Sequence, residues 1–175
     1  MILIINKFRF RIVGAIVGLG AGLAVLGAAG GTGTASAVNC RAVDGQQIQK
    51  VVAHSGCGAK AGKGSQATAL ESGGRGTAVA VADTGGRATA DNRQPGSVGL
   101  AGAFDGGVAR SLTVGPNALA VAQAAKGGNT LAVGGPGSQA KVGPTGADCY
   151  GALSVAVDLN LAKGCVKLGP AEFVQ

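Results

Sequence analysis

Between Ser65 and Gly146, short runs of Ala, Val and Leu are separated by Gly-rich turns. Seven of these runs can be aligned, and they start at Ala67, Ala78, Ala88, Val98, Ala109, Ala120 and Leu131. Glycine pairs and four prolines occupy the gaps: Gly73-Gly74, Gly85-Gly86, Gly106-Gly107, Gly127-Gly128, Gly134-Gly135, Pro95, Pro116, Pro136 and Pro144. A near-fixed interval with glycine turns predicts a repeat architecture.

The spacing predicts the fold class. Each run is long enough for a strand of about five residues whose alternate side chains point inward. Two strands and two turns make a coil of about 20 residues, so residues 65–147 hold about four coils. We therefore expect an all-β protein built on a small Ala/Gly-rich β-solenoid, similar to a β-roll. An antiparallel sandwich is the alternative, because hairpins also recur every 8–12 residues.

Residues 38–64 are expected to form an N-terminal cap with a short helix. Asp44 and Gln47 have the spacing of a capping box, and Gly56 and Gly58 follow as stop signals. Three apolar residues between them share one helical face: Ile48, Val51 and Val52. This helical cap would cover the first edge of the repeats.

Residues 148–175 are expected to form a C-terminal strand cap. From Leu153 to Leu161, large apolar residues alternate with small or polar ones, which is the clearest strand pattern in the chain. Larger apolar side chains suit a segment that must close an open sheet edge.

Residues 1–37 have the features of a signal peptide. A basic start with Lys7, Arg9 and Arg11 precedes the uncharged run from Ile12 to Ala29, and Ala35-Ser36-Ala37 fits a cleavage site. We expect a secreted or cell-envelope protein. An uncleaved membrane anchor is the alternative, because the apolar run is long enough to span a bilayer.

Charge and aromatic content narrow the class of protein. Cleavage after Ala37 removes three basic residues and lowers the formal net charge from +7 to +4. The remaining basic residues are scattered and have no aromatic residues between them, so nucleic acid is not an expected partner. Only Phe104, Tyr150 and Phe173 remain as aromatic residues. Alanine buries little area, so a regular backbone ladder must hold the fold.

Four cysteines in an exported chain predict two disulfides. If the repeats separate the two ends, Cys40 pairs with Cys57 and Cys149 with Cys165; a pairing between the caps is the alternative. A zinc site of His54 with Cys40 and Cys57 lacks a nearby fourth ligand, and exported thiols oxidise. We expect no metal ligands.

Other motifs do not predict a cofactor. The glycine-rich run 58–65 lacks the first Gly and the Ser or Thr of a phosphate loop, because Cys57 and Gly64 stand there. Two glycine-rich turns start like calcium-binding repeats, but Ala78 and Gln139 replace the Asp. Thr68 and Thr89 lie in matched runs, as on ice-binding or glycan-binding surfaces, but the threonines do not recur later.

No catalytic residues are predicted. His54 is the only imidazole, and no nucleophile motif accompanies it. One side of a solenoid would bring Asp83, Asp91 and Asp105 together, but Asp beside a turn commonly bonds the backbone. We therefore expect a protein that is not an enzyme.

Two runs, Asn117–Gly134 and Gly137–Gly143, resemble the head repeats of trimeric surface adhesins. That resemblance implies a surface-exposed solenoid, adhesion or trimerisation, although a stalk and a translocation barrel are missing. The whole chain also resembles small secreted actinobacterial proteins of unknown function. Neither resemblance assigns a functional residue.

These observations predict an exported, non-enzymatic protein that acts through contacts of its solenoid surface, in adhesion or structure, with an envelope or extracellular partner. The alternative is a secreted glycan- or ligand-binding protein, which would have a deep pocket lined by several of the Asp residues. A small Ala core leaves little stability to spare, so a homo-oligomer is a third hypothesis.

Overall fold

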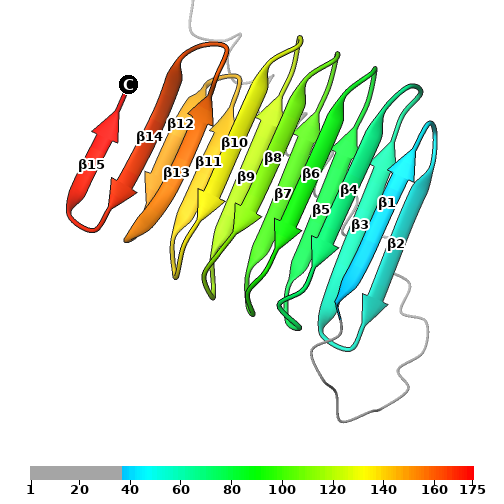
Figure 1. Cartoon of the computed structure of the whole chain (residues 1–175), viewed down its shortest axis with the longest axis horizontal. Coiled ribbons are helices and arrows are strands. Elements are labelled where there is room, and N and C mark those ends of the chain that lie inside the picture. Colours follow the sequence, from blue (N-terminus) through cyan, green and yellow to red (C-terminus); the bar gives the residue numbers. More distant parts are fainter. Residues whose placement is uncertain (1–36) are drawn as a thin grey trace, which may run out of the picture. The chain divides into compact units, whose positions relative to one another are not determined.

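The computed structural model describes residues 37–175, and every regular element in that part of the chain is a β-strand (Figure 1). The strands form two sheets. Sheet A has the spatial order β1 (Val38–Val43), β4 (Gln66–Glu71), β6 (Arg87–Asn92), β8 (Val108–Thr113), β10 (Asn129–Gly134), β13 (Leu153–Asp158), β14 (Lys163–Leu168) and β15 (Ala171–Val174). Sheet B has the order β12 (Gly146–Tyr150), β11 (Gln139–Gly143), β9 (Leu119–Ala124), β7 (Val98–Ala103), β5 (Thr77–Ala82), β3 (Ser55–Ala61) and β2 (Gln47–Val52).

Consecutive strands from β3 to β11 alternate between the sheets, and strands of the same sheet run parallel. In sheet B, Gly56 pairs with Thr77, Thr77 with Val98 and Val98 with Leu119, so each of these coils contains the same number of residues. The last step, from Leu119 to Gln139, is shorter by a single residue. Winding coils of this kind confirm the predicted solenoid and exclude the antiparallel sandwich.

All seven aligned runs lie in solenoid strands, one in each strand from β4 to β10. The parallel stack also includes β3, which pairs with β5. Sheet A is therefore parallel from β4 to β10, and sheet B from β3 to β11. Antiparallel strands extend both sheets at each end.

The core consists of methyl-sized side chains because the two sheets lie close together. Ala67, Ala88 and Ala109 stack in register on the inner side of sheet A, and Ala80 and Ala101 do so in sheet B. The disulfides that cross between the sheets join Cα atoms only 5.7 and 5.9 Å apart. Larger side chains at these alanine positions would push the sheets apart, since protein interiors are close-packed.

Two-residue turns at one edge of the solenoid keep the sheets close. Thr84-Gly85, Asp105-Gly106 and Lys126-Gly127 each have two consecutive positive φ angles, as a type I′ turn requires. The N–H of Gly86 closes the first of these turns by donating to the Asp83 carbonyl over 3.0 Å. Three of the five Gly pairs in the sequence, Gly85-Gly86, Gly106-Gly107 and Gly127-Gly128, therefore lie at this edge, while most prolines lie at the other.

The predicted N-terminal helix is wrong. Residues 47–52 form β2, which pairs antiparallel with β3 from Gln47 to Val52. Asp44 and Gly45 have φ angles of 43° and 84°, so they form a turn, and the Asp44 carboxylate accepts the Gly64 N–H over 3.0 Å. The β-branched residues of β2 gain more from the open edge of β3 than from an isolated helical turn. The predicted stop signals Gly56 and Gly58 lie inside β3.

The predicted C-terminal strand is present, although it is shorter than predicted. β13 ends at Asp158, whose carboxylate accepts the N–H groups of Asn160 and Leu161 and so forms a turn. The chain then returns as β14 and β15, both antiparallel to their neighbours. Leu161 consequently lies exposed in the turn rather than in a strand.

The predicted signal peptide over residues 1–37 lies, apart from Ala37, outside the described residues. Among residues 37–175, no helix is long and apolar enough to cross a membrane.

Candidate functional surfaces

The cysteines form the two predicted pairs, each joining the two sheets at one end of the solenoid. Cys40 of β1 is bonded to Cys57 of β3, and Cys149 of β12 to Cys165 of β14. All four cysteines are buried in the core, and the cross-cap alternative is excluded. Disulfides of this kind indicate an oxidising compartment.

Metal-binding residues do not gather anywhere between residues 37 and 175. No three His, Cys, Asp or Glu side chains in that range lie close enough to hold an ion. His54 lies in the turn between β2 and β3, and its nearby cysteine, Cys57, is oxidised. The zinc hypothesis therefore has no thiolate to use.

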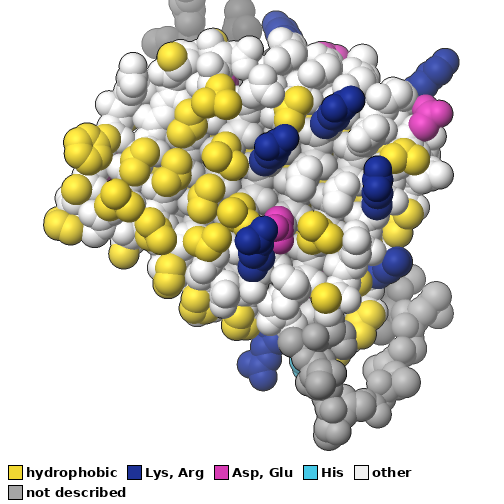
Figure 2. Space-filling view, viewed as in Figure 1, with side chains coloured by type: hydrophobic (Ala, Val, Ile, Leu, Met, Phe, Trp, Pro, Cys, Tyr) yellow, Lys and Arg dark blue, Asp and Glu magenta, His cyan; other side chains and the backbone are white. Residues whose placement is uncertain are grey.

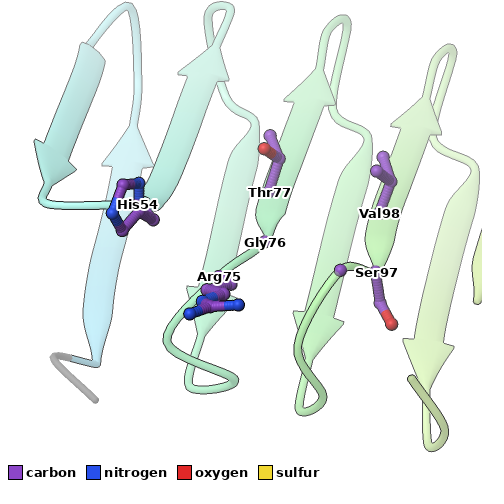
Figure 3. Close-up of a pocket in the computed structure, with 7 residues that line it drawn as sticks. His54, Arg75, Gly76, Thr77, Ser97 and Val98 are labelled. Carbon is purple, nitrogen blue, oxygen red and sulfur yellow. The ribbon is translucent and has the colours of Figure 1, made fainter. Parts of the chain in front are cut away.

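An open depression of about 520 Å³ lies beside His54 (Figure 3). Arg75 and Gly76 come from the connection between β4 and β5, and Thr77 from the start of β5. Ser97 and Val98 come from the next coil. The depression is thus made by turns of successive coils, and its lining contains a cationic guanidinium and an imidazole but no carboxylate.

A buried polar ladder lies directly behind this depression. Glu71, Asn92 and Thr113 occupy the last position of β4, β6 and β8 and stack in register with side chains inward. Asn92 donates to the Glu71 carboxylate and to the Ser97 carbonyl, the latter over 2.8 Å. Thr113 donates to the Asn92 amide oxygen, and Ser55 donates to Glu71 over 3.4 Å.

Glu71 is only 1% exposed, and among the described residues no Lys or Arg pairs with it. Burial raises the pKa of the Glu71 carboxyl, and hydrogen bonds from Gly74, Asn92, Gly73 and Ser55 oppose that rise. Because Asn92 and Ser55 donate to the carboxylate and Thr113 donates to Asn92, the side chains of the ladder bond one another and stabilise the coil corner. It leaves no free group for chemistry on a substrate.

Gly76 makes room for this ladder. A Cβ atom at residue 76 would lie 2.1 Å from the Asn92 amide nitrogen and 2.8 Å from a Glu71 carboxylate oxygen. Sequence reasoning missed the ladder, although its signal is present: three larger polar residues recur at a sequence separation of 21. That signal becomes visible only when the coil length is known exactly.

The three Asp residues considered for catalysis do not converge. Asp83 and Asp105 lie at the edge formed by the two-residue turns, and the Asp83 carboxylate accepts the Thr84 N–H over 2.8 Å. Asp91 lies near the other end of β6, about 16 Å away by strand rise. There it pairs with Arg93 at 2.7 Å, so the expectation that it serves a turn is wrong for Asp91. None of the three lines the depression.

The outer face of sheet A is apolar toward one end. A continuous column crosses five strands, each residue paired with the next: Leu112, Val133, Val155, Val166 and Phe173. Leu131, Val157 and Leu168 flank it. We call these eight residues the apolar face. Figure 2 shows hydrophobic side chains gathered over the β13–β15 end and most Lys and Arg toward the other end.

The rest of that outer face carries more polar and charged side chains, with single apolar residues such as Leu70 and Val108 among them. Arg41, Thr68, Thr89 and Arg110 form one column, so the threonine row stops after two strands. The outer face of sheet B carries a smaller apolar stripe of half-buried side chains, Val79, Leu100 and Val121, in register across β5, β7 and β9. Flat apolar surface, rather than a deep cleft, is therefore the main feature that contact with another molecule could use.

Fold and surface together define a class of protein: a two-sheet β-solenoid with an alanine core, held at both ends by disulfides between the sheets. Residues 5–168 match the model of a family of unknown function (DUF6764), and the chain belongs to that family. No curated protein and no solved structure shows significant similarity to the chain. The resemblance to adhesin heads and to actinobacterial secreted proteins stays a prediction.

Proposed function

We propose that this protein is exported and acts in the cell envelope or outside the cell as a non-catalytic solenoid, through contacts of its flat outer faces. Export is supported by the signal-peptide features of residues 1–37 and by the two disulfides, which persist in oxidising compartments.

The apolar face is the single observation that carries this proposal. A sheet face that meets only water normally presents polar side chains opposite its core-facing positions. On β10 and β13 the outward residues instead include Leu131, Val133, Val155 and Val157. Contiguous apolar surface of this kind marks contact sites in soluble proteins.

A non-catalytic role is supported by the way the titratable groups are used. Glu71 is enclosed by its own hydrogen bonds, and Asp91 is paired with Arg93. Asp83 bonds its own turn. A hydrolytic or acyl-transfer mechanism needs a nucleophile and a base, or two carboxylates, held near one another. Each of these three carboxylates instead interacts with its own separate partners.

The contact role can be tested by retention in the envelope. We expect Val155→Lys, in the centre of the apolar face, to release the exported protein from the envelope fraction into the soluble fraction. Thr89→Lys makes the same change in charge at the polar end of the same outer face and should leave retention unchanged. Equal retention of both variants would overturn the proposal.

Export itself is tested by thiol labelling in intact cells. A membrane-permeant alkylating reagent should modify none of the four cysteines before reduction and all of them afterwards. Cysteines that are labelled without reduction would place the chain in a reducing compartment and contradict export.

A second candidate function is supported by the depression at His54. Arg75 and His54 come from successive turns and lie at the same open hollow, which suits an anionic group such as the sulfate or phosphate of a glycan. Titration with a sulfated oligosaccharide should then show binding that Arg75→Ala removes and Arg87→Ala keeps. Equal binding by both variants would exclude the depression as the binding site.

A further inference from the structure

The two sheets do not end together at the C-terminal end. Across the core, β13 lies against β11, and β14 lies against β12. Sheet A then continues by one more strand, β15, whereas sheet B stops at β12. Strand β15 packs against β14 alone, and no strand of sheet B in the described chain lies opposite it. We call this arrangement the overhang.

The overhang leaves apolar groups open on both of its faces. Phe173 pairs with Val166 and points outward, and it is 68% exposed. Val174 pairs with the core residue Cys165, so it points toward the layer of sheet B, yet it is 69% exposed. A side chain on the core side of a sheet is so exposed because none of the described strands of sheet B lies opposite it.

The free edge of β15 is able to pair with another strand. Gln175 and Gly164 exchange both backbone hydrogen bonds, at 2.9 and 3.2 Å. In an antiparallel pair such residues alternate with non-bonded ones, so Phe173 also bonds β14, while Glu172 and Val174 direct their N–H and C=O groups away from it. Among the described strands, none pairs with the outer edge of β12 either. Lys167 lies 2.9 Å from Glu172, so the inward carboxylate on this edge is charge-compensated.

The overhang is self-complementary. Consider a second copy, rotated by 180° about an axis that is parallel to the strands and passes between the sheets at this end. The rotation exchanges the layers and reverses the order of strands, but it keeps each strand direction. The second β15 then enters the layer of sheet B beside β12, and the first β15 lies beside the second β12.

Strand direction also fits this arrangement. β12 is antiparallel to β11. β13 runs with β11 because it is antiparallel to β10, which a two-residue turn reverses relative to β9, and β11 is parallel to β9. β14 reverses direction again, and β15 once more, so β15 runs with β11 and opposite to β12. The inserted strand would therefore make an antiparallel pair, and antiparallel pairs already close this end of both sheets.

We propose that two copies of this chain join end to end through the overhang, each placing β15 beside β12 of the other. This interface, which we call the joint, contains two antiparallel strand pairs. It covers both Val174 side chains, which face each other across the core. Strand addition to an open edge is a recurring mode of recognition. This proposal does not depend on export or on the role of the apolar face.

Two substitutions of neighbouring residues test it. In the oxidised exported protein, sedimentation equilibrium at tens of micromolar should show twice the mass of one chain. Val174→Asp places two facing carboxylates in the joint and should weaken dimerisation at least about tenfold. Phe173→Asp adds the same charge on the outward side and should leave the dimer intact. Both positions are exposed, and circular dichroism will verify that both variants keep the fold.

The alternative outcomes are distinguishable. A monomeric wild-type protein, or a dimer that Val174→Asp leaves unchanged, would overturn the proposal. Loss of the dimer only in Phe173→Asp would overturn it in favour of packing through the apolar face.

A cysteine variant adds a geometric test. Val174 lies in register with Cys165, whose Cα is 5.9 Å from that of Cys149 in the opposite sheet. The joint places the two Val174 residues in the same relation, one strand further along. Val174→Cys should therefore give a covalent dimer on non-reducing gels, and Phe173→Cys should not. Equal cross-linking of the two variants would contradict the joint.

Discussion

At the N-terminal end of the solenoid, β1 and β2 extend the two sheets by one strand each, and a buried polar ladder supports the neighbouring coils. At the C-terminal end, sheet A continues one strand beyond sheet B and the ladder is absent. The column of paired residues that contains the ladder continues instead through Gly134 to Ser154, whose hydroxyl has no hydrogen-bond partner among residues 37–175. Both ends use antiparallel strands and one disulfide. The difference is that the two sheets end together at the N-terminal end, whereas at the C-terminal end β15 has no described strand of sheet B opposite it.

The largest expected effect comes from removing each disulfide. The bonds close loops with sequence separations of 17 and 16, so replacing either pair by alanine should lower the free energy of unfolding by about 3 kcal/mol. Urea denaturation measures the loss, and hydrogen exchange locates it. Loss of Cys40–Cys57 should expose β1–β4, and loss of Cys149–Cys165 should expose β11–β15. Uniform exchange along the chain would show that the ends are not separate units.

The next effect concerns the polar ladder near the N-terminal end. Gly76→Ala forces a methyl group into Asn92 and Glu71 and should cost about 1–3 kcal/mol of unfolding free energy. Gly58→Ala is the matched control, because its Cβ would meet only Val79 methyl groups at 3.9 Å. Thermal or chemical denaturation compares the two. Equal stability of the two variants would mean that the ladder does not need the space at Gly76.

A smaller effect should appear in the pH dependence of stability. Burial raises the folded-state pKa of Glu71 above its ordinary value of 4.5, so folding favours the protonated carboxyl. The associated stability is present below pH 4.5 and is lost as the pH rises through the folded pKa. Relative to Glu71→Gln, the wild-type protein should therefore become less stable between pH 4 and pH 7. Denaturation midpoints measured across this range should diverge, and parallel curves would contradict the assignment.

The smallest effect should be at the C-terminal end, in the ion pair between Lys167 and Glu172. Both side chains are partly exposed, at 27% and 43%, so solvent screens the attraction. At protein concentrations far below those of the proposed dimer, Lys167→Met should change the unfolding free energy by less than about 1 kcal/mol. A larger loss in urea denaturation would mean that the pair supports β15 more than its exposure suggests.

The sequence allowed the coils to be predicted because their signal is local and repeated. Alternate small apolar residues, Gly turns and a near-constant interval identify a strand and its turn without knowledge of the rest of the chain. The seven predicted strands are all present. The cysteine pairing followed from the same reasoning, since a solenoid separates its two ends.

The helix prediction over Asp44 to Gly56 failed for the opposite reason. A capping box and one apolar face are local signals. These residues instead form β2, which pairs along its whole length with the open edge of β3. The polar ladder was missed because Glu71, Asn92 and Thr113 become neighbours only when the true coil length, slightly longer than the predicted one, is known. A single-residue error in the period moves a side chain to the other face of a strand.

The sequence by itself determined the solenoid and its alanine core, because both depend on composition and spacing along the chain. Only the tertiary structure decided which outward residues join into the apolar face and which strand has no partner across the core. Those features depend on register and on the number of strands in each sheet. Register and strand number are set by how segments far apart in the chain pair with one another, and no local pattern records them.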